Sequence, residues 1–312
     1  LTGFDEPDAI ALFLSHKPKG ERYILFVHPK DIESEVWNGF RWGTNGAEKV
    51  FKADKSHPIS DFEKELPNYL MGADEIVFSV GKYPEIEPIV LNLWAKQIDN
   101  YSRIGRAPRA IQPPGIYLNQ MRLIKSQYEI ERMREAALIS AEAHELVRLN
   151  VGGKNNERQI QGLLEGFFFE KGTRGPAYNT IAASGDNACV LHYTANNSEL
   201  KKGDLLLVDA GCSLPDYYNG DITRTFPIGG KFSGEQRAIY EIVLEAQKRA
   251  IQSVITGVSS SDIHNEALKV IIEGLLQINL LKGGVDEIIE NCSYKHFYMH
   301  KTGHWLGLDV HD

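Results

Sequence analysis

The most informative carboxylate in the sequence is Asp209. The apolar run Leu205–Val208 has the composition of a buried strand and leads directly into it. A carboxylate at the end of such a run is largely desolvated, and an unpaired buried charge is costly, so it needs a partner such as a metal ion. The alternative is an aspartate that ends the strand and caps a turn.

A second carboxylate, Asp221, opens another strand. If residues 214–219 contain the chain reversal, the strands pair antiparallel, and Asp209 and Asp221 face each other across the ladder at roughly 5 Å. Like charges in that position repel unless a cation or a shared proton lies between them. The pair therefore indicates a metal site more strongly than either residue alone. In the alternative, Asp221 pairs with Arg224 at the surface.

Three of the ten histidines lie in the final segment, at positions His300, His304 and His311. The first two are four residues apart, which places them on one face of either a helix or a strand. A bend near Gly307 would bring His311 to the same site. This concentration indicates a functional cluster, whereas His192, taken alone, is interpreted as structural.

The composition is that of a globular protein. The chain has 312 residues, which favours two domains over a single large one. The apolar and charged fractions, 42% and 24%, exclude a disordered, collagen-like or coiled-coil chain. With 34 Lys and Arg against 42 Asp and Glu, the net charge of -8 provides no positive field for nucleic acid or an anionic membrane. We therefore expect neither as a partner.

The three cysteines, Cys189, Cys212 and Cys292, are far apart and show no CxxC spacing. This pattern implies neither a disulfide framework nor a zinc knuckle, and it fits a reducing compartment, the cytoplasm, best. No apolar run has the roughly 20 residues of a membrane-spanning helix, and no targeting segment is expected. Motifs of the GxSxG, HExxH and P-loop types are also missing from the sequence.

The coarse pattern of elements divides the chain. Before residue 115, apolar runs at Tyr23–Val27 and Glu75–Ser79 alternate with a helical pattern over Pro84–Arg103, which predicts a small α/β domain. The Pro-rich stretch Ala107–Gly115 disfavours helix and is expected to be the linker. The predicted domains are therefore residues 1–115 and 116–312.

The second part begins with two predicted helices, Ser126–Arg148, with Ser126 and Glu129 as a capping box, and Asn155–Lys171. Four strands, two helices and an extended segment are expected to follow: Ala177–Ala183, Cys189–Tyr193, Asp204–Cys212 and Tyr217–Phe226, then Ser233–Ile255 and Ser260–Leu276, then His296–Asp312. Helices and a mostly antiparallel sheet in separate blocks predict an α+β domain.

Several motifs together resemble the Xaa-Pro aminopeptidase (aminopeptidase P) group of the creatinase, prolidase and methionine aminopeptidase superfamily. They are spread over nearly the whole chain: Leu1–Pro7, Met121–Ser126, Tyr178–Ile181, Leu191–Tyr193, Val208–Cys212, Gly220–Pro227 and His304–Asp312. The resemblance implies an α+β fold, with a C-terminal pita-bread metallopeptidase domain preceded by a smaller α/β domain with a mixed sheet.

The resemblance also implies roles for individual residues. Asp209, Asp221 and His304 match three of the five ligands of a dinuclear metal site. His300 and His311 match active-site histidines that serve the reacting carbonyl and proton transfer.

Three further positions match residues that contact substrate. His192 would flank the prolyl pocket, Arg122 would lie near the substrate, and Trp37 would approach a neighbouring subunit's site in a homo-oligomer, either a dimer or a tetramer.

The sequence departs from the family pattern at two places. The segment between the aspartates is one residue longer than in a bacterial relative, and Lys301 stands where many relatives have glycine. The family's last two ligands are glutamates beyond position 312. We therefore expect a chain that is incomplete at both ends, with a truncated pita-bread domain that is inactive by itself.

The implied activity is hydrolysis of the N-terminal Xaa-Pro bond of peptides with proline at the second position. Two divalent metal ions would polarise the carbonyl and supply a bridging hydroxide as nucleophile. Carboxylate-dominated ligation favours Mn²⁺, with Zn²⁺ or Co²⁺ as alternatives. A prolidase restricted to dipeptides would share every motif. An inactive pita-bread domain that binds proteins is a further alternative, although such a domain has no reason to keep two opposed buried carboxylates.

Overall fold

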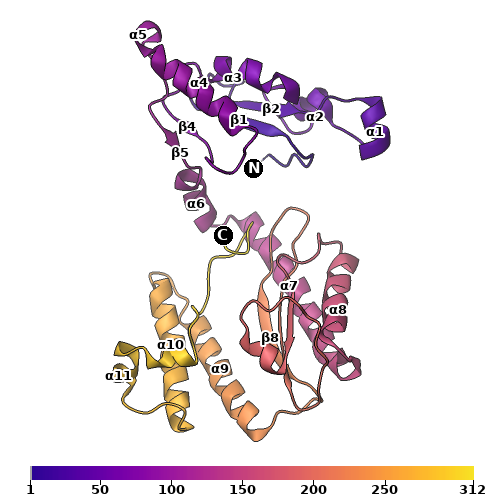
Figure 1. Ribbon diagram of the computed structural model, residues 1–312, viewed down its shortest axis with the longest axis vertical. Helices are drawn as coiled ribbons and strands as arrows, with labels where there is room; N and C mark the ends of the chain where they lie inside the picture. Colours follow the sequence, from indigo (N-terminus) through magenta and orange to yellow (C-terminus); the bar gives the residue numbers. More distant parts are fainter. Residues whose placement is uncertain (1) are drawn as a thin grey trace. The chain divides into compact units, whose positions relative to one another are not determined.

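The structure is a computed structural model that describes residues 2–312, apart from the side chain of Ile104. It consists of two compact units, with the division between Met121 and Arg122 (Figure 1). The domain boundary at residue 115 stays a prediction. Within the described residues, no helix is long and apolar enough to cross a membrane.

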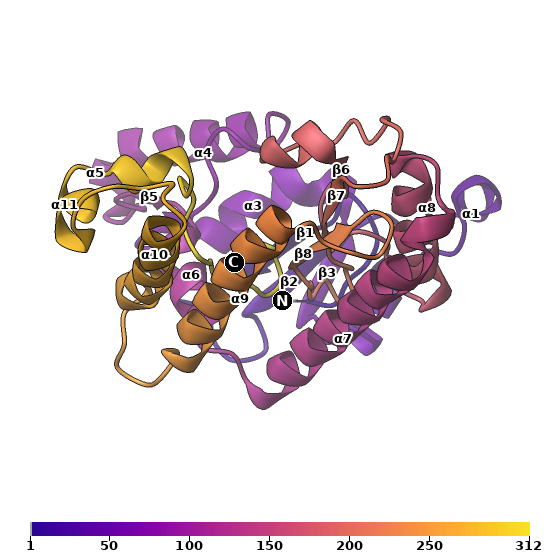
Figure 2. The ribbon, with the colours of Figure 1, turned by 90° about the horizontal axis from the view of Figure 1, so that it is seen from below.

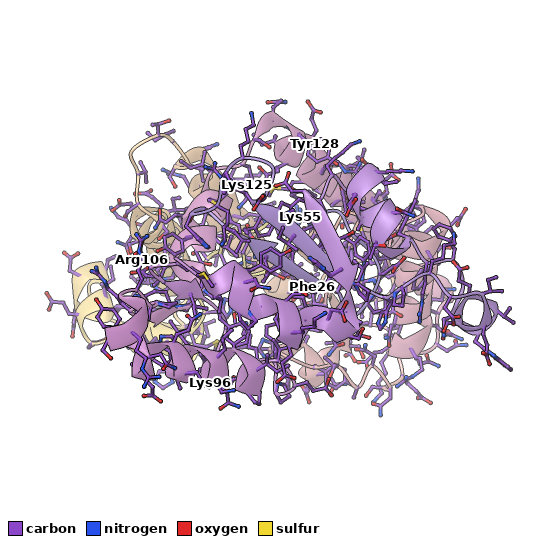
Figure 3. The ribbon with its side chains drawn as sticks, turned by 90° about the horizontal axis from the view of Figure 1, so that it is seen from above. Phe26, Lys55, Lys96, Arg106, Lys125 and Tyr128 are labelled. Carbon is purple, nitrogen blue, oxygen red and sulfur yellow. The ribbon has the colours of Figure 1, made fainter. Side chains whose placement is uncertain are left out.

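The first unit contains a three-stranded mixed sheet. Strand β1 (Ile10–Phe13) pairs antiparallel with β2 (Tyr23–Val27), and β2 pairs parallel with β3 (Lys55–Pro58). The mixed sheet confirms the prediction. Phe26 of β2 is fully buried and packs edge to face against Phe62 (Phe26 is labelled in Figure 3).

The helices of this unit follow the apolar pattern only in part. They are α1 (Ile32–Asn38), α2 (Gly43–Lys49), the 3₁₀ helix η1 (Ile59–Asp61), α3 (Phe62–Leu70), α4 (Glu87–Asp99) and α5 (Tyr101–Ile104), and α6 (Gly115–Leu123) spans the division between the units. The single helix expected over Pro84–Arg103 is therefore two helices, which meet at Asn100.

The Pro-rich stretch is more ordered than expected. It contributes β5 (Ile111–Gln112), which pairs parallel with β4 (Ile76–Val77), the short core of the strand expected at Glu75–Ser79. Its prolines flank the paired residues and leave their backbone groups available for the ladder, and the role of Ala107–Gly115 as the linker stays a prediction.

The second unit is built around an antiparallel sheet in the order β6 (Ile181–Ser184), β7 (Leu205–Ala210) and β8 (Ile222–Pro227). Two helices, α7 (Gln127–Asn150) and α8 (Glu157–Glu170), lie along one face of this sheet (Figure 2). Ser126 caps α7 and forms the expected capping box with Glu129. The 3₁₀ helix η2 (Val151–Gly153) joins α7 to the loop before α8.

The alternation along β7 separates the two faces of the sheet. Leu206, Val208 and Ala210 are fully buried and belong to the core formed with α7 and α8, whereas Asp209 is half-buried and lies on the other face. The strand's apolar run thus supports the core on one side and presents a carboxylate on the other.

The remaining elements form a separate group. Helices α9 (Gly234–Gln252) and α10 (Ser260–Gln277) pack side by side, and the short helices α11 (Val285–Glu290) and η4 (Ser293–His296) follow. The final segment has no regular structure and runs back to the beginning of α7, as the yellow ribbon in Figure 1 shows.

One predicted strand is wrong. Residues 189–193 belong to the 3₁₀ helix η3 (Gly185–Cys189) and to turns, instead of the expected strand Cys189–Tyr193. The physical reason is that Asn187 and Tyr193 direct their side chains to the buried carboxylate of Glu157, so the segment folds around this group.

Candidate metal centre

Asp209 and Asp221 lie on one face of the sheet but not directly opposite each other. Asp209 pairs with Thr223, and Asp221 precedes Thr223 by two residues. Diagonal neighbours of this kind are about 7–8 Å apart and share a face, because side chains alternate with a period of two. The predicted direct opposition is therefore wrong. The turn closed by the Ser213–Asn219 bridge sets this register.

Tyr178 lies between the two carboxylates. Its hydroxyl is 2.6 Å from Oδ1 of Asp209 and 2.7 Å from Oδ1 of Asp221. Ile181 pairs with Asp209, and Pro176 pairs with Cys212. The chain from Pro176 to Ile181 is therefore longer than the chain from Asp209 to Cys212 that it faces, so the segment containing Tyr178 bulges. The bulge turns the phenol toward the carboxylate pair.

The protonation of these three groups is coupled. Burial raises the pKa of Asp209, and the charge of Asp221 raises it further, against the opposing effect of the Tyr178 hydrogen bond. Burial and the two carboxylates also raise the pKa of Tyr178 far above its ordinary value, which keeps the phenol a donor. The single hydroxyl proton of Tyr178 is therefore shared by two carboxylates. The carboxylate pair keeps an excess of negative charge, which a bound cation would neutralise.

His304 extends this chain of contacts. Its Nε2 lies 3.0 Å from Oδ2 of Asp221, and its Nδ1 donates to the carbonyl of Trp305 at 2.8 Å. Because Nδ1 is engaged by this carbonyl, Nε2 is the ring nitrogen that faces Asp221 and the one available as a metal ligand. The ring of His311 lies beside it, with the ring centroids 4.2 Å apart.

Polar contacts hold the final segment against the sheet. The side-chain amide of Asn219 donates to the carbonyls of Gly307 and Leu308, at 3.3 and 3.0 Å. Asp312, whose side chain is 2% exposed, accepts hydrogen bonds from Arg122 and Lys125. Because Asn219 precedes Asp221 closely, these contacts bring the histidine segment to the carboxylates.

The other predicted site residues are placed as follows. His300 is exposed, and its Nδ1 donates to the carbonyl of the adjacent Lys301. His192 is exposed on the loop after η3.

The two remaining residues predicted to lie near the substrate are Arg122 and Trp37, and these roles stay predictions. Arg122 is bound to Asp309 and Asp312, and Trp37 lies on α1 of the first unit with 83% of its surface exposed. The structure thus brings together Asp209, Asp221, His304 and His311, and it leaves His300 outside their contacts.

Tyr178 was not identified from the sequence as a site residue. The motif Tyr178–Ile181 begins with this residue, but its spacing gives no role to the phenol, because the bulge before β6 decides where the side chain points. Its position two residues after a proline in a segment that turns into a strand is too common to mark a site.

The donor chemistry of the cluster fits a divalent cation. Asp209 and Asp221 offer hard oxygen ligands, the buried pair has an excess of negative charge, and His304 adds an imidazole nitrogen. The three form a row of contacts and do not surround one point, and no group of three or more His, Cys, Asp or Glu side chains within residues 2–312 is arranged to hold a metal ion.

Two protein-family models match most of the chain. Residues 131–312 match the family model described as metallopeptidase family M24, and residues 1–78 match the aminopeptidase P N-terminal domain. The chain belongs to metallopeptidase family M24. It is a metal-dependent aminopeptidase of the aminopeptidase P group, and divalent metal ions are its cofactors.

Individual M24 relatives match over the entire chain. A Xaa-Pro aminopeptidase of Haemophilus influenzae is 41% identical over 312 residues, which are 100% of this chain and 70% of the relative. An aminopeptidase PepP structure from Pseudomonas aeruginosa has a TM-score of 0.91 at 40% identity, again with 100% and 70% covered. A zinc-substituted Escherichia coli aminopeptidase P in complex with product has a TM-score of 0.92 at 36% identity and the same coverage. These matches confirm the predicted α+β fold with an M24 pita-bread domain.

Proposed function

We propose that this enzyme removes the N-terminal residue from peptides with proline at the second position. The observation that carries the proposal is the row of contacts from Asp209 through Tyr178 and Asp221 to His304. Relatives at 36–41% identity are named Xaa-Pro aminopeptidases, which supports the choice of substrate.

Asp209, Asp221 and His304 are the proposed metal ligands. When bound, two divalent ions would polarise the scissile carbonyl and supply a hydroxide nucleophile. Mn²⁺ is the proposed native ion, because carboxylate oxygens outnumber the imidazole nitrogen in this set. Tyr178 stays protonated beside the pair and holds one oxygen of each carboxylate, so the carboxylates remain in position despite their repulsion.

The nearby histidines provide proton chemistry. The proline nitrogen is a poor leaving group until it is protonated, and His311, whose ring lies edge-on beside that of His304, is the proposed proton carrier together with His300. His192 is proposed to contact the proline of the substrate, and Arg122 to hold the segment containing His311 near the substrate through Asp312.

The substrate test compares three peptides on the Mn²⁺-loaded holoenzyme. Cleavage of Xaa-Pro-Xaa, with little cleavage of the matching Xaa-Ala-Xaa peptide, is expected. Faster cleavage of the Xaa-Pro dipeptide than of the tripeptide would favour a prolidase. Absence of cleavage of all three, with retained peptide binding, would favour a protein-binding domain.

Further properties of the enzyme are proposed from the same residues. The exposed Trp37 supports a homo-oligomer, a dimer or tetramer, in which it approaches a neighbouring subunit. Cys189, Cys212 and Cys292 are unpaired thiols in the structure, which supports a reducing compartment such as the cytoplasm. The net charge of -8 argues against nucleic acid and anionic membranes as partners. Separate folding of residues 1–115 and 116–312 is likewise a proposal.

A further inference from the structure

Glu157 is a buried carboxylate outside the metal centre. It is the first residue of α8, it is 0% exposed, and it is absent from the salt bridges formed by the described residues. Burying such a group requires hydrogen bonds at both oxygens, because an unsatisfied buried charge is strongly destabilising. The hydrogen-bond partners of Glu157 therefore show which part of the molecule it stabilises.

All five hydrogen bonds accepted by its carboxylate come from the segment 184–198. Oε1 accepts from the backbone N–H and the hydroxyl of Ser184, at 2.7 and 2.8 Å, and from the side-chain amide of Asn187 at 3.1 Å. Oε2 accepts from the hydroxyl of Tyr193 at 2.7 Å and from the backbone N–H of Ser198 at 2.9 Å. Glu157 thus connects the beginning, the middle and the end of one loop.

The ionised form of Glu157 suits this arrangement. Burial alone would raise its pKa, but the hydrogen bonds from Ser198, Ser184, Asn187 and Tyr193 together bring the pKa below its ordinary value. A carboxylate offers two acceptor oxygens to five donors. A glutamine at position 157 would replace one acceptor oxygen with an NH₂ group, which cannot accept hydrogen bonds from the donors on that side.

The loop carries His192 next to Tyr193. The imidazole is exposed, whereas the carboxylate of Glu157 is fully buried. Tyr193 itself is half-buried, with its hydroxyl directed to Glu157. The hydrogen bond of Tyr193 is therefore the contact that joins Glu157 to the backbone of His192.

We propose that Glu157 and Tyr193 are positioning residues that fix the backbone carrying His192, the proposed contact of the substrate proline, and thereby set the preference for proline at the second position. This proposal rests on the proposed function and deepens it. Neither residue contacts the substrate, and both act through the backbone that carries the histidine. Specificity then depends on a buried carboxylate of α8, which lies outside the loop that carries the imidazole.

The first experiment is a double-mutant cycle on the Mn²⁺-loaded holoenzyme. Tyr193→Phe keeps the ring and removes only the hydroxyl, and Tyr240→Phe, at a half-buried tyrosine of α9 whose ring is tilted against that of Phe232, is the matched control. We expect Tyr193→Phe to lower kcat/KM for Xaa-Pro-Xaa about tenfold, mainly through KM, with unchanged metal content.

In a His192→Ala background, the same Tyr193→Phe change is expected to have no further effect, since the two residues act as one unit. A full additional tenfold loss in that background would overturn the proposal, because Tyr193 would then act independently of His192. Normal kinetics of Tyr193→Phe in the native background would overturn it as well.

The second experiment does not depend on activity. Amide hydrogen exchange of residues 185–198 in the metal-free protein is expected to be about tenfold faster in Tyr193→Phe and faster still in Glu157→Gln, with no change in Tyr240→Phe. Unchanged exchange in Tyr193→Phe would exclude the positioning role. If the native enzyme fails to cleave Xaa-Pro peptides while exchange responds as expected, the proposed substrate is wrong and the structural part of the inference stands.

Discussion

The hydroxyl of Tyr178 lies 2.6 Å from Oδ1 of Asp209, a contact that joins a bulged segment to the end of a core strand. The same oxygen lies 2.7 Å from Asp221, so a single phenol orients both proposed carboxylate ligands. Residues that orient metal ligands commonly alter metal affinity by 10–100-fold when they are removed.

Tyr178→Phe is therefore expected to weaken Mn²⁺ binding by the metal-free protein about tenfold or more. The loss arises because the carboxylates repel each other and no donor holds them. Isothermal titration with Mn²⁺ measures the change. Tyr128→Phe removes a hydroxyl that donates to Asp216 at 2.9 Å on the surface, and it should leave the affinity unchanged. Equal affinities for the two variants would contradict the role of Tyr178.

Asp209→Asn should stabilise the metal-free protein but remove most of the stability that metal binding adds to the native protein. Burial and Asp221 raise the pKa of Asp209, which means that its charged form costs stability at neutral pH in the metal-free protein. The variant is expected to raise the Tm of the metal-free protein and to abolish most of the Tm increase that Mn²⁺ produces in the native protein. Thermal unfolding with and without Mn²⁺ tests both effects, and a lower metal-free Tm would count against this account of the carboxylate pair.

His144 makes the stability of the second unit depend on pH. It is 4% exposed, its Nε2 donates to the carbonyl of Ala210 at 3.0 Å, and its Nδ1 has no partner among the described residues. Burial lowers its pKa, so the folded state favours the neutral ring. The contribution is fully present above the unfolded pKa of about 6.5 and is lost as pH falls below it.

We therefore expect Tm to decrease from pH 7.5 to pH 5.5, with a smaller decrease in His144→Gln. The exposed His296→Gln variant is the control and should retain the decrease of the native protein. A native-like pH dependence in His144→Gln would show that another group is responsible.

The approach of the strands next to the aspartates requires glycine. A Cβ added to Gly211 would lie 1.8 Å from the carbonyl oxygen of Gly220, which is backbone and cannot move aside. Gly211→Ala is expected to destabilise the protein by roughly 3 kcal/mol or more. Gly234→Ala, at the first residue of α9 with open space around it, should change stability by no more than about 1 kcal/mol. Chemical denaturation measures both, and similar losses for the two variants would refute the steric explanation.

Local patterns were sufficient for much of the second unit. The cap of α7 depends on Ser126 and Glu129, three residues apart, and β7 depends on a continuous apolar run, so each could be predicted from a short window. The similarity of the motifs also indicated the family before any coordinates, because they preserve the residue types that the chemistry requires.

Interactions between distant segments decided the rest. The turn that sets the register placed Asp209 opposite Thr223 and only diagonal to Asp221, and the bulge before β6 directed Tyr178 to both. Residues 189–193 have the composition of a strand, yet a buried carboxylate on α8 takes Tyr193 as its partner and folds the segment into turns. The sequence by itself determined the types of metal-binding side chain and most of the helices and strands. The register of strand pairing and the burial of Glu157 determined which of these side chains are in contact. These depend on the free energy of the whole packed unit, which no short stretch of residues contains.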